Sequence, residues 1–240
     1  MSDSRSRKAL LVTGTDTVVG KTMLTCAIAR ALVERGSRVG VYKPVETGCS
    51  VVAGGLLAED VEKLLAAAGG GQAVETAITY RFALPAAPLV AAAEARETID
   101  PLRIIAGYES VARDYDIVLV EGAGGLLVPI ADNYTYLDVA RQLALPVLCV
   151  VGSRLGCINH ALLTLRMLLY SGVRCVGYAM NVLDADKATY DAAASNQRTI
   201  ARFTAARYVG SFPFVAPNER GNWNRLGSLA AKHLELDAII

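Results

Sequence analysis

The chain has 240 residues, of which 24 are basic and 23 are acidic, so its formal net charge is +1. This balance differs from the strongly basic composition of typical nucleic-acid binders. A short basic run at residues 5–8 is the exception, and we interpret it as a solvated N-terminal tail. No stretch approaches the roughly 18 apolar residues of a membrane span, so we predict neither a nucleic-acid nor a membrane partner.

Apolar runs alternate with helical patterns along the whole chain. Strands are predicted at residues 10–13, 38–42, 117–121, 147–151, 175–180 and 208–212, and helices at 21–34, 58–68, 101–113, 137–143, 159–170, 187–206 and 226–234. The strands are apolar on consecutive positions, which is typical of strands buried on both faces. This order predicts an α/β fold with a doubly wound, mainly parallel β-sheet, helices on both faces, and one domain over residues 1–240.

A glycine-containing loop ending in Gly20-Lys21-Thr22 lies between the first strand and the first helix. This order is typical of a P-loop, whose backbone N–H groups and following helix hold a polyphosphate. Lys21 would reach the β- and γ-phosphates, and Thr22 would place its hydroxyl on Mg²⁺. The standard glycine six residues before Lys21 is replaced by Thr15, so we predict that Thr15 keeps an ordinary backbone and that Gly14 supplies the bend. The sequence therefore predicts ATP binding.

Polar residues stand where two further strands end, and ligands of such sheets bind at the carboxyl ends of the strands. Lys43 follows the second strand, where a second lysine beside Lys21 could neutralise a transferring phosphoryl group. Glu121 closes the third strand, and burying its charge without a partner would be costly. We therefore predict that Glu121 serves Mg²⁺ or substrate, and that glycines such as Gly124 let the backbone approach a ligand closely.

Two later strands are also followed by candidate binding groups. The loop 152–160 is glycine-rich and opens a helix, so it could hold a carboxylate or a phosphate. Arg154 either adds charge to that loop or forms a surface ion pair, and His160 is interpreted as a packing or capping residue. Asn181 follows the fifth strand, and its amide offers a donor and an acceptor that match adenine N6 and N7.

The five cysteines are scattered and lack the spacing of metal ligands: Cys26, Cys49, Cys149, Cys157 and Cys175. We interpret all five as buried structural residues. The alternative for Cys157 is a thiol of lowered pKa, because it lies near a predicted helix start. The first apolar stretch is interrupted at Thr13 and is too short for a secretory signal. A phosphate loop with unpaired thiols predicts a cytoplasmic protein.

Four motifs, at residues 13–22, 42–48, 120–125 and 155–160, together resemble the dethiobiotin synthetase family. The resemblance runs from Leu10 to Pro213. It implies an ATP- and Mg²⁺-dependent cyclo-ligase of biotin biosynthesis that converts 7,8-diaminononanoate and CO₂ into dethiobiotin, with ADP and phosphate as the other products. In the implied scheme an amine captures CO₂ as a carbamate, the carbamate attacks the γ-phosphate, and the second amine closes the ring on the mixed anhydride.

The resemblance also implies a role for each matching residue. The catalytic lysines would be Lys21 and Lys43. ATP would contact Asp16, Thr17, Val18, Val19, Gly20, Lys21, Thr22, Met23, Asn181 and Pro213. Mg²⁺ would be held by Thr22, Asp60 and Glu121, with Glu59 as the alternative to Asp60. The substrate would contact Thr47, Glu121 and Gly124, and its carboxylate tail would meet Gly156, Cys157, Ile158, Asn159 and Tyr190 at a homodimer interface that contains the active site.

Two other classes of P-loop protein compete with this interpretation. Partitioning or positioning ATPases usually carry Lys-Gly-Gly in the loop, whereas this chain has Asp16-Thr17-Val18, which argues against a switch of that kind. An amidoligase-type enzyme would need a glutaminase module, and no segment remains for one. Val18 also stands where some dethiobiotin synthetases carry an acidic residue, so no carboxylate acts from that position.

Overall fold

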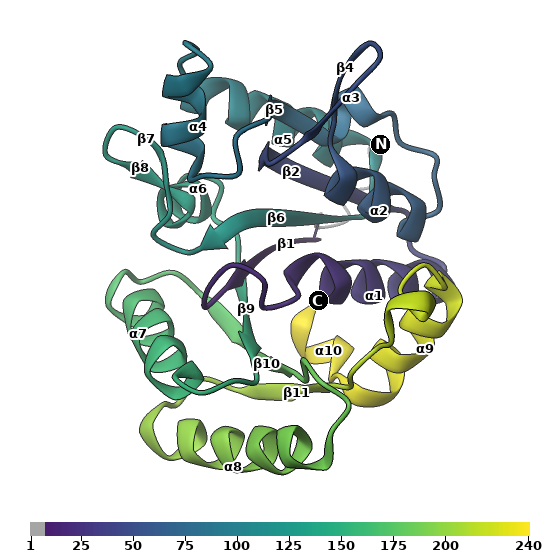
Figure 1. Cartoon of the computed structure of the whole chain (residues 1–240), viewed down its shortest axis with the longest axis vertical. Coiled ribbons are helices and arrows are strands. Elements are labelled where there is room, and N and C mark those ends of the chain that lie inside the picture. Colours follow the sequence, from purple (N-terminus) through teal and green to yellow (C-terminus); the bar gives the residue numbers. More distant parts are fainter. Residues whose placement is uncertain (1–7) are drawn as a thin grey trace, which may run out of the picture.

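The computed structural model describes residues 8–240, so most of the basic run 5–8 lies outside the described residues. Seven parallel strands form one sheet in the order β11-β10-β9-β1-β6-β2-β5 (Figure 1). The strands are β1 (Lys8–Gly14), β2 (Val39–Thr47), β5 (Ile78–Phe82), β6 (Ile117–Gly125), β9 (Val147–Gly152), β10 (Cys175–Asn181) and β11 (Tyr208–Phe212). The chain extends the sheet from β1 first toward β5 and later toward β11, so the predicted doubly wound parallel sheet is confirmed.

Helices cover both faces of this sheet (Figure 1). On one face Leu10 and Val12 of β1 share a core with α1, α2, α9 and α10, whereas Leu11 faces a core with α4, α5 and α6. Cys149 and Val151 of β9 pack with α7 and α8. The helices are α1 (Lys21–Glu34), α2 (Glu59–Ala67), α3 (Val74–Ala77), α4 (Pro88–Glu94), α5 (Pro101–Asp114), α6 (Tyr136–Gln142), α7 (Cys157–Tyr170), α8 (Lys187–Phe203), α9 (Trp223–His233), α10 (Leu236–Ile239) and the 3₁₀ turn η1 (Pro217–Glu219).

The edge strand β5 is absent from the sequence prediction. Ile78, Tyr80 and Phe82 are buried while the residues between them are half-buried, because β5 pairs only with β2. Such alternation differs from the consecutive apolar runs of the inner strands. Two antiparallel hairpins, β3 (Ser50–Val52) with β4 (Gly55–Leu57) and β7 (Pro129–Ala131) with β8 (Tyr134–Thr135), were also not predicted. Strand β2 runs five residues past its predicted end, so Lys43 lies within the strand and not after it.

The loop between β1 and α1 bends at other residues than predicted. Left-handed backbone occurs at Val18 (φ +56°) and Gly20 (φ +84°), while Gly14 and Thr15 have ordinary φ values. Gly14 is required for space instead, since an added Cβ would lie 2.8 Å from Cγ2 of Val19. The prediction for Thr15 is therefore confirmed and that for Gly14 is wrong. A β-branched residue in the left-handed region costs about 1–2 kcal/mol, so Val18 carries backbone strain.

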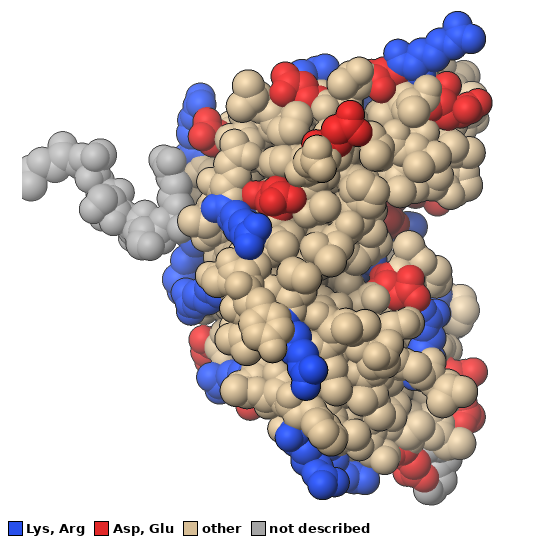
Figure 2. Space-filling model, turned by 90° about the vertical axis from the view of Figure 1, so that its left-hand side faces the viewer, with Lys and Arg blue, Asp and Glu red and all other residues tan. Residues whose placement is uncertain are grey.

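Among the described residues, no helix is both long enough and apolar enough to cross a membrane. Figure 2 shows the side of the molecule on which α6, α7 and the β7–β8 hairpin lie. Basic and acidic side chains are interspersed there and leave wide areas without charge.

Candidate active site

A cleft of about 680 Å³ lies at the carboxyl ends of the central strands. It brings together eleven of the residues predicted to form the site: Thr17, Val18, Gly20, Lys21, Thr22, Met23, Lys43, Thr47, Asp60, Gly124 and Asn181. These residues come from the P-loop, the ends of β2, β6 and β10, and the first turn of α2. The convergence follows from topology, because the carboxyl ends of parallel strands share one edge of the sheet.

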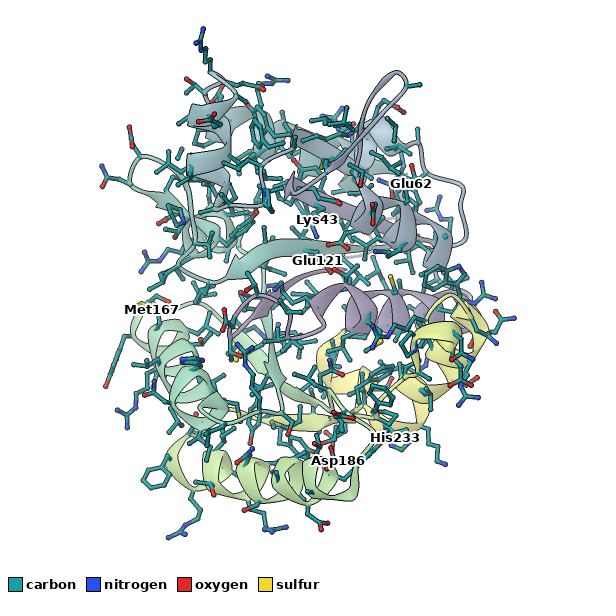
Figure 3. All side chains as sticks on the ribbon, viewed as in Figure 1. Lys43, Glu62, Glu121, Met167, Asp186 and His233 are labelled. Carbon is teal, nitrogen blue, oxygen red and sulfur yellow. The ribbon has the colours of Figure 1, made fainter. Side chains whose placement is uncertain are left out.

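Lys43 is the most tightly held charged group in this cleft. Its ammonium Nζ donates to Oδ2 of Asp60 at 2.6 Å and to Oε1 of Glu121 at 2.8 Å. Figure 3 shows Lys43 and Glu121 next to one another at the centre of the molecule. Burial alone would lower the pKa of Lys43, but the carboxylates of Glu121, Asp60 and Glu46 outweigh burial and hold that pKa above its ordinary value. Lys43 is therefore a fixed positive charge.

Thr22, Asp60 and Glu121 provide oxygen atoms that suit Mg²⁺. The Thr22 hydroxyl donates to Oε1 of Glu121 at 2.8 Å, and Oε2 of the fully buried Glu121 has no protein partner. Residues 8–240 contain no cluster of three or more His, Cys, Asp or Glu side chains that could hold a metal ion. Mg²⁺ commonly uses one or two carboxylates together with substrate phosphates, so this donor set fits Mg²⁺ bound with a nucleotide.

The geometry favours Asp60 over Glu59 as the acidic group on the metal side. Asp60 lines the cleft, whereas the exposed Glu59 accepts a hydrogen bond from the Ser50 hydroxyl at 2.7 Å, on the β3–β4 hairpin. Burial would raise the pKa of Asp60, but the charge and hydrogen bond of Lys43 lower it below its ordinary value. Asp60 is thus an ionised carboxylate beside a lysine.

Lys21 lies in the same cleft as Lys43 but is held differently. Its ammonium donates to the backbone oxygen of Asp16 at 3.1 Å, so it folds back over the loop. Burial lowers the pKa of Lys21, Glu121 opposes this effect, and the like charge of Lys43 adds to it. An anion placed between the two lysines would relieve their repulsion.

The residues that line the cleft include Asn181, which carries a buried and unpaired hydrogen-bond acceptor. The amide of the fully buried Asn181 donates from Nδ2 to the backbone oxygen of Val19 at 2.8 Å, and its Oδ1 has no partner. A Cβ on Gly20 would lie 2.1 Å from Nδ2 of Asn181, so only glycine fits there. Phe214 and Arg220 also line the cleft, and the predicted Pro213 lies outside its lining.

Arg154 combines the two roles that the sequence left open. It lines the cleft and forms an ion pair with Asp16. The Asp16 carboxylate also accepts the backbone N–H of Thr17 at 2.7 Å. This backbone hydrogen bond is the main reason that the pKa of Asp16 is lowered, and the charge of Arg154 contributes despite partial desolvation. Asp16 therefore braces the P-loop and does not line the cleft.

The residues predicted to hold a substrate tail do not join this cleft in a single chain. Gly156, Ile158 and Asn159 line a separate groove of about 510 Å³, next to the fully exposed Leu155. Cys157 is buried, and burial raises its pKa. The alternative of a low-pKa thiol at Cys157 is therefore wrong.

Tyr190 and the cysteines are placed as follows. The hydroxyl of Tyr190 accepts the backbone N–H of Phe214 at 3.2 Å, and Tyr190 lines neither the cleft nor the groove. All five cysteines are free; four are buried, as predicted, and Cys175 is half-buried.

Gly122 and Ala123 of the predicted motif 120–125 also line the cleft, whereas the sequence did not single out Glu46, Val182, Leu183, Phe214 and Arg220. For Glu46 a signal was present, since a carboxylate within an apolar strand needs a partner, which is the argument that identified Glu121. For Phe214 and Arg220 no local pattern was available, because both lie in an irregular segment after β11.

Solved structures with the same fold include two relatives of low sequence identity. The MinD cell division protein of Aquifex aeolicus superimposes with a TM-score of 0.54 at 20% identity, covering 97% of this chain and 93% of that one. A ParA family ATPase of Chlorobium tepidum has a TM-score of 0.53 at 14% identity, covering 98% and 97%. These likenesses concern the fold alone.

Comparisons of the sequence are more specific. A family model described as an AAA domain matches residues 8–220. The chain is 40% identical over 209 residues to the ATP-dependent dethiobiotin synthetase BioD of Aromatoleum aromaticum, covering 87% of this chain and 92% of the relative. It is 36% identical to BioD 1 of Escherichia coli K12 (88% and 92% covered) and 36% identical to BioD of Ralstonia nicotianae (95% and 96% covered). The chain therefore belongs to the ATP-dependent dethiobiotin synthetase family of enzymes.

Proposed function

We propose that this chain converts 7,8-diaminononanoate, CO₂ and ATP into dethiobiotin, ADP and phosphate. The names of its relatives support the product and the use of ATP. The observation that carries the proposal is the placement of Lys21 and Lys43 in one cleft, with Thr22, Asp60 and Glu121 beside them. Such a cluster suits a reaction in which two anions must be brought together.

The proposed chemistry has three balanced steps. One amine attacks CO₂, forms a C–N bond and loses a proton, which leaves a carbamate. A carbamate oxygen attacks the γ-phosphorus of ATP, the bond from that phosphorus to the bridging oxygen breaks, and ADP leaves. The second amine then attacks the carbonyl carbon, loses a proton and expels phosphate, which closes the cyclic urea.

The lysines would act mainly in the second step. A carbamate and a triphosphate repel each other, and the two ammonium groups would offset that repulsion and align the attacking oxygen with phosphorus. Lys43 is already held in place by two carboxylates, so little reorganisation is needed as charge develops. Lys21 is held only by a backbone oxygen and can turn toward the phosphates.

Mg²⁺ would be held by Thr22, Asp60 and Glu121. When bound, it would neutralise charge on the β- and γ-phosphate oxygens. The unpartnered Oε2 of Glu121 and the ionised Asp60 are the groups that support this assignment. Thr47 and Gly124, which line the same cleft, would contact the diamine.

ATP would lie along the P-loop with its base toward Asn181. The unpaired Oδ1 of Asn181 would accept a hydrogen bond from the exocyclic amine of adenine. In place of Pro213, Phe214 would border the base, because it lines the cleft and closely follows Phe212, which pairs with Asn181.

We infer that the working enzyme is a cytoplasmic homodimer. Leu155, just before α7, and Phe203 on α8 are exposed apolar side chains that line the same groove as the tail-binding residues. Leu163 and Leu169 on α7 are further exposed apolar side chains. A second copy covering this surface would bring Gly156 and Asn159 to the cleft of its neighbour. The uncapped N-terminus of α7, where Gly156 has φ +90°, would then meet the substrate carboxylate.

The deciding experiment mixes the protein with ATP, Mg²⁺, bicarbonate and 7,8-diaminononanoate and follows the products by mass spectrometry. We expect the cyclic urea to appear in a 1:1 ratio with ADP. ATP turnover that ignores the diamine and increases with DNA or liposomes would instead support a partitioning or positioning ATPase. Turnover that requires glutamine or ammonia in place of CO₂ would support an amidoligase.

A further inference from the structure

Glu46 is a buried carboxylate of the cleft to which the proposed reaction gives no role. It is 5% exposed and lies three residues after Lys43 in β2. Both of its oxygens are occupied by α2: Oε1 accepts the backbone N–H of Asp60 at 2.9 Å, and Oε2 accepts that of Val61 at 3.1 Å. Glu46 therefore connects the catalytic strand to the helix that carries Asp60.

Helix α2 lacks a capping residue of its own. Its N-cap is Ala58, which forms no side-chain hydrogen bond, although the first N–H groups of a helix need partners. An N-cap side chain usually accepts from the second or third helical N–H, which here belong to Asp60 and Val61. Glu46 takes over this function from another strand, and its charge strengthens the two hydrogen bonds.

The path of β2 makes this contact possible. In a regular strand Val41, Lys43 and Val45 would share one face. Val41 packs in the core beside α1 and α2, but Val45 packs in the core on the opposite face. The pairing of β2 with β6 ends at Tyr42, and the regular alternation of faces is broken between Val41 and Val45. As a result Glu46, and not Val45, faces α2 together with Lys43.

We propose that Glu46 is a positioning residue that fixes the first turn of α2, so that the Asp60 carboxylate lies against the Lys43 ammonium in the Mg²⁺-binding region. Its catalytic consequence rests on the proposed function, whereas its structural consequence does not. The competing role for Glu46 is direct attraction of the cationic diamine, since the residue lines the cleft and precedes Thr47. The two roles predict different measurements.

The structural test is hydrogen exchange of backbone amides in the full chain without ligands. In Glu46→Ala the amides of Asp60 and Val61 should exchange at least about tenfold faster, since their acceptor is gone. Glu46→Gln keeps the size of the side chain and one acceptor oxygen, so it should give an intermediate effect if Glu46→Ala folds poorly. Glu62→Gln is the matched control, because Glu62 lies in the same turn, is exposed and does not line the cleft. Unchanged exchange in both Glu46 variants would overturn the proposal.

The functional test separates positioning from substrate contact. Glu46→Gln should lower kcat about tenfold and raise the Mg²⁺ concentration for half-maximal activity, with the KM for the diamine changed less than about threefold. Binding of Mn²⁺ with a non-hydrolysable ATP analogue, followed by electron paramagnetic resonance, should weaken in parallel. A large rise in the diamine KM with kcat and Mn²⁺ binding retained would show that Glu46 contacts substrate and would overturn the proposal.

A second-site variant tests whether the cap itself is what matters. Ala58→Ser places a capping hydroxyl at the N-cap of α2. Added to Glu46→Ala, it should restore part of the amide protection and raise kcat at least about threefold above that of Glu46→Ala alone. Restored protection without any gain in kcat or in Mn²⁺ binding would contradict the proposal. If the wild-type protein formed no cyclic urea, the proposed function would fail, and amide exchange and Mn²⁺ binding would still decide the role of Glu46.

Discussion

The P-loop end of the sheet and the α7 end differ in how much of a site one chain provides. At the P-loop end the buried Lys21 and Lys43 line one cleft, and Lys43 pairs with the fully buried Glu121. At the α7 end Gly156 and Asn159 border a separate groove, and no described part of the chain covers it. We infer that one subunit assembles the phosphoryl-transfer groups, whereas recognition of the substrate tail requires a second surface.

Electrostatics gives a reason for this difference. A buried charge is tolerated only when it is paired within the folded chain, so Lys43 has to meet Asp60 and Glu121 before any ligand arrives. An apolar surface such as Leu155 carries no comparable penalty in water. It can therefore stay open until a partner covers it.

The largest effect is expected for Lys21→Ala. Loss of this ammonium removes charge and alignment at the γ-phosphate, so turnover should fall by roughly a thousandfold or more. Single-turnover formation of ADP and of the cyclic urea measures the loss. Lys232→Ala, an exposed lysine on α9, is the control and should behave as wild type. Unaltered catalysis in Lys21→Ala would contradict the role given to the whole P-loop end.

Lys43→Gln should have the next largest effect. We expect kcat to fall on the order of a hundredfold, with a milder loss of nucleotide affinity, because the charge is needed most as phosphoryl transfer proceeds. Rapid-quench kinetics and nucleotide titration separate the two quantities. Lys63→Gln provides a control, since Lys63 is half-exposed and lies 3.5 Å from Asp60. Equal losses in binding and rate would make Lys43 a nucleotide clamp.

Leu155→Asp tests whether the tail-binding site at the α7 end needs a second copy of the chain. The side chain is fully exposed in one chain, so the fold should tolerate the charge while a covering copy would be repelled. We expect sedimentation to show monomers and the diamine KM to rise about tenfold or more, with ATP binding retained. Leu102→Asp on α5, also exposed, should change neither. A dimer that survives Leu155→Asp with a normal KM would place the tail site elsewhere.

Thr47→Val tests whether the Thr47 hydroxyl contacts the diamine or the nucleotide. The change keeps the shape of the side chain and removes one hydroxyl, which is worth about 1 kcal/mol in a hydrogen bond, or roughly fivefold in affinity. The KM for the diamine should rise by that factor while the KM for ATP stays within about twofold. A larger effect on ATP would relocate Thr47 to the nucleotide site.

The same contrast shows what could be predicted from sequence. The P-loop, the inner strands and most helices were predicted because each depends on local patterns of apolar residues, glycine and caps. The predicted helix 101–113, for example, is preceded by Asp100, which caps α5 by accepting the N–H of Leu102. The edge strand β5 was missed because its pattern reflects a position in the sheet, which local sequence does not reveal.

Site residues follow a similar division. Lys43 and Glu121 could be placed on one sheet edge from topology alone, but Asp60 was assigned only through the family resemblance. The role of Glu46 depends on a break in the alternation of faces along β2, between Val41 and Val45, which local sequence does not reveal. The role of Gly14 depends on a contact with Val19 across the loop, so reasoning from backbone angles gave the wrong explanation.

The smallest effect concerns the support beneath the P-loop end. Tyr136 is fully buried, and a Cβ on Gly122 would lie 3.3 Å from its ring, so Tyr136 supports the wall 122–124 of the cleft. Burial raises the pKa of Tyr136 from 10.0 to about 12. Because the folded-state pKa is the higher one, the stabilisation is complete below pH 10 and is lost as pH rises toward 12. The expected loss is roughly 2–3 kcal/mol of unfolding free energy.

Tyr136→Phe isolates this contribution, because all other groups that titrate in alkali are shared with wild type. Urea unfolding from pH 8.5 to 12 should give two curves of free energy against pH, and the wild-type curve should fall more steeply above pH 10. The variant should keep near-normal turnover at neutral pH, since the ring still supports the wall. Parallel curves would mean that water reaches the Tyr136 hydroxyl. In that case the wall 122–124 would not be rigidly packed, and a single chain would not hold the P-loop end in its final arrangement.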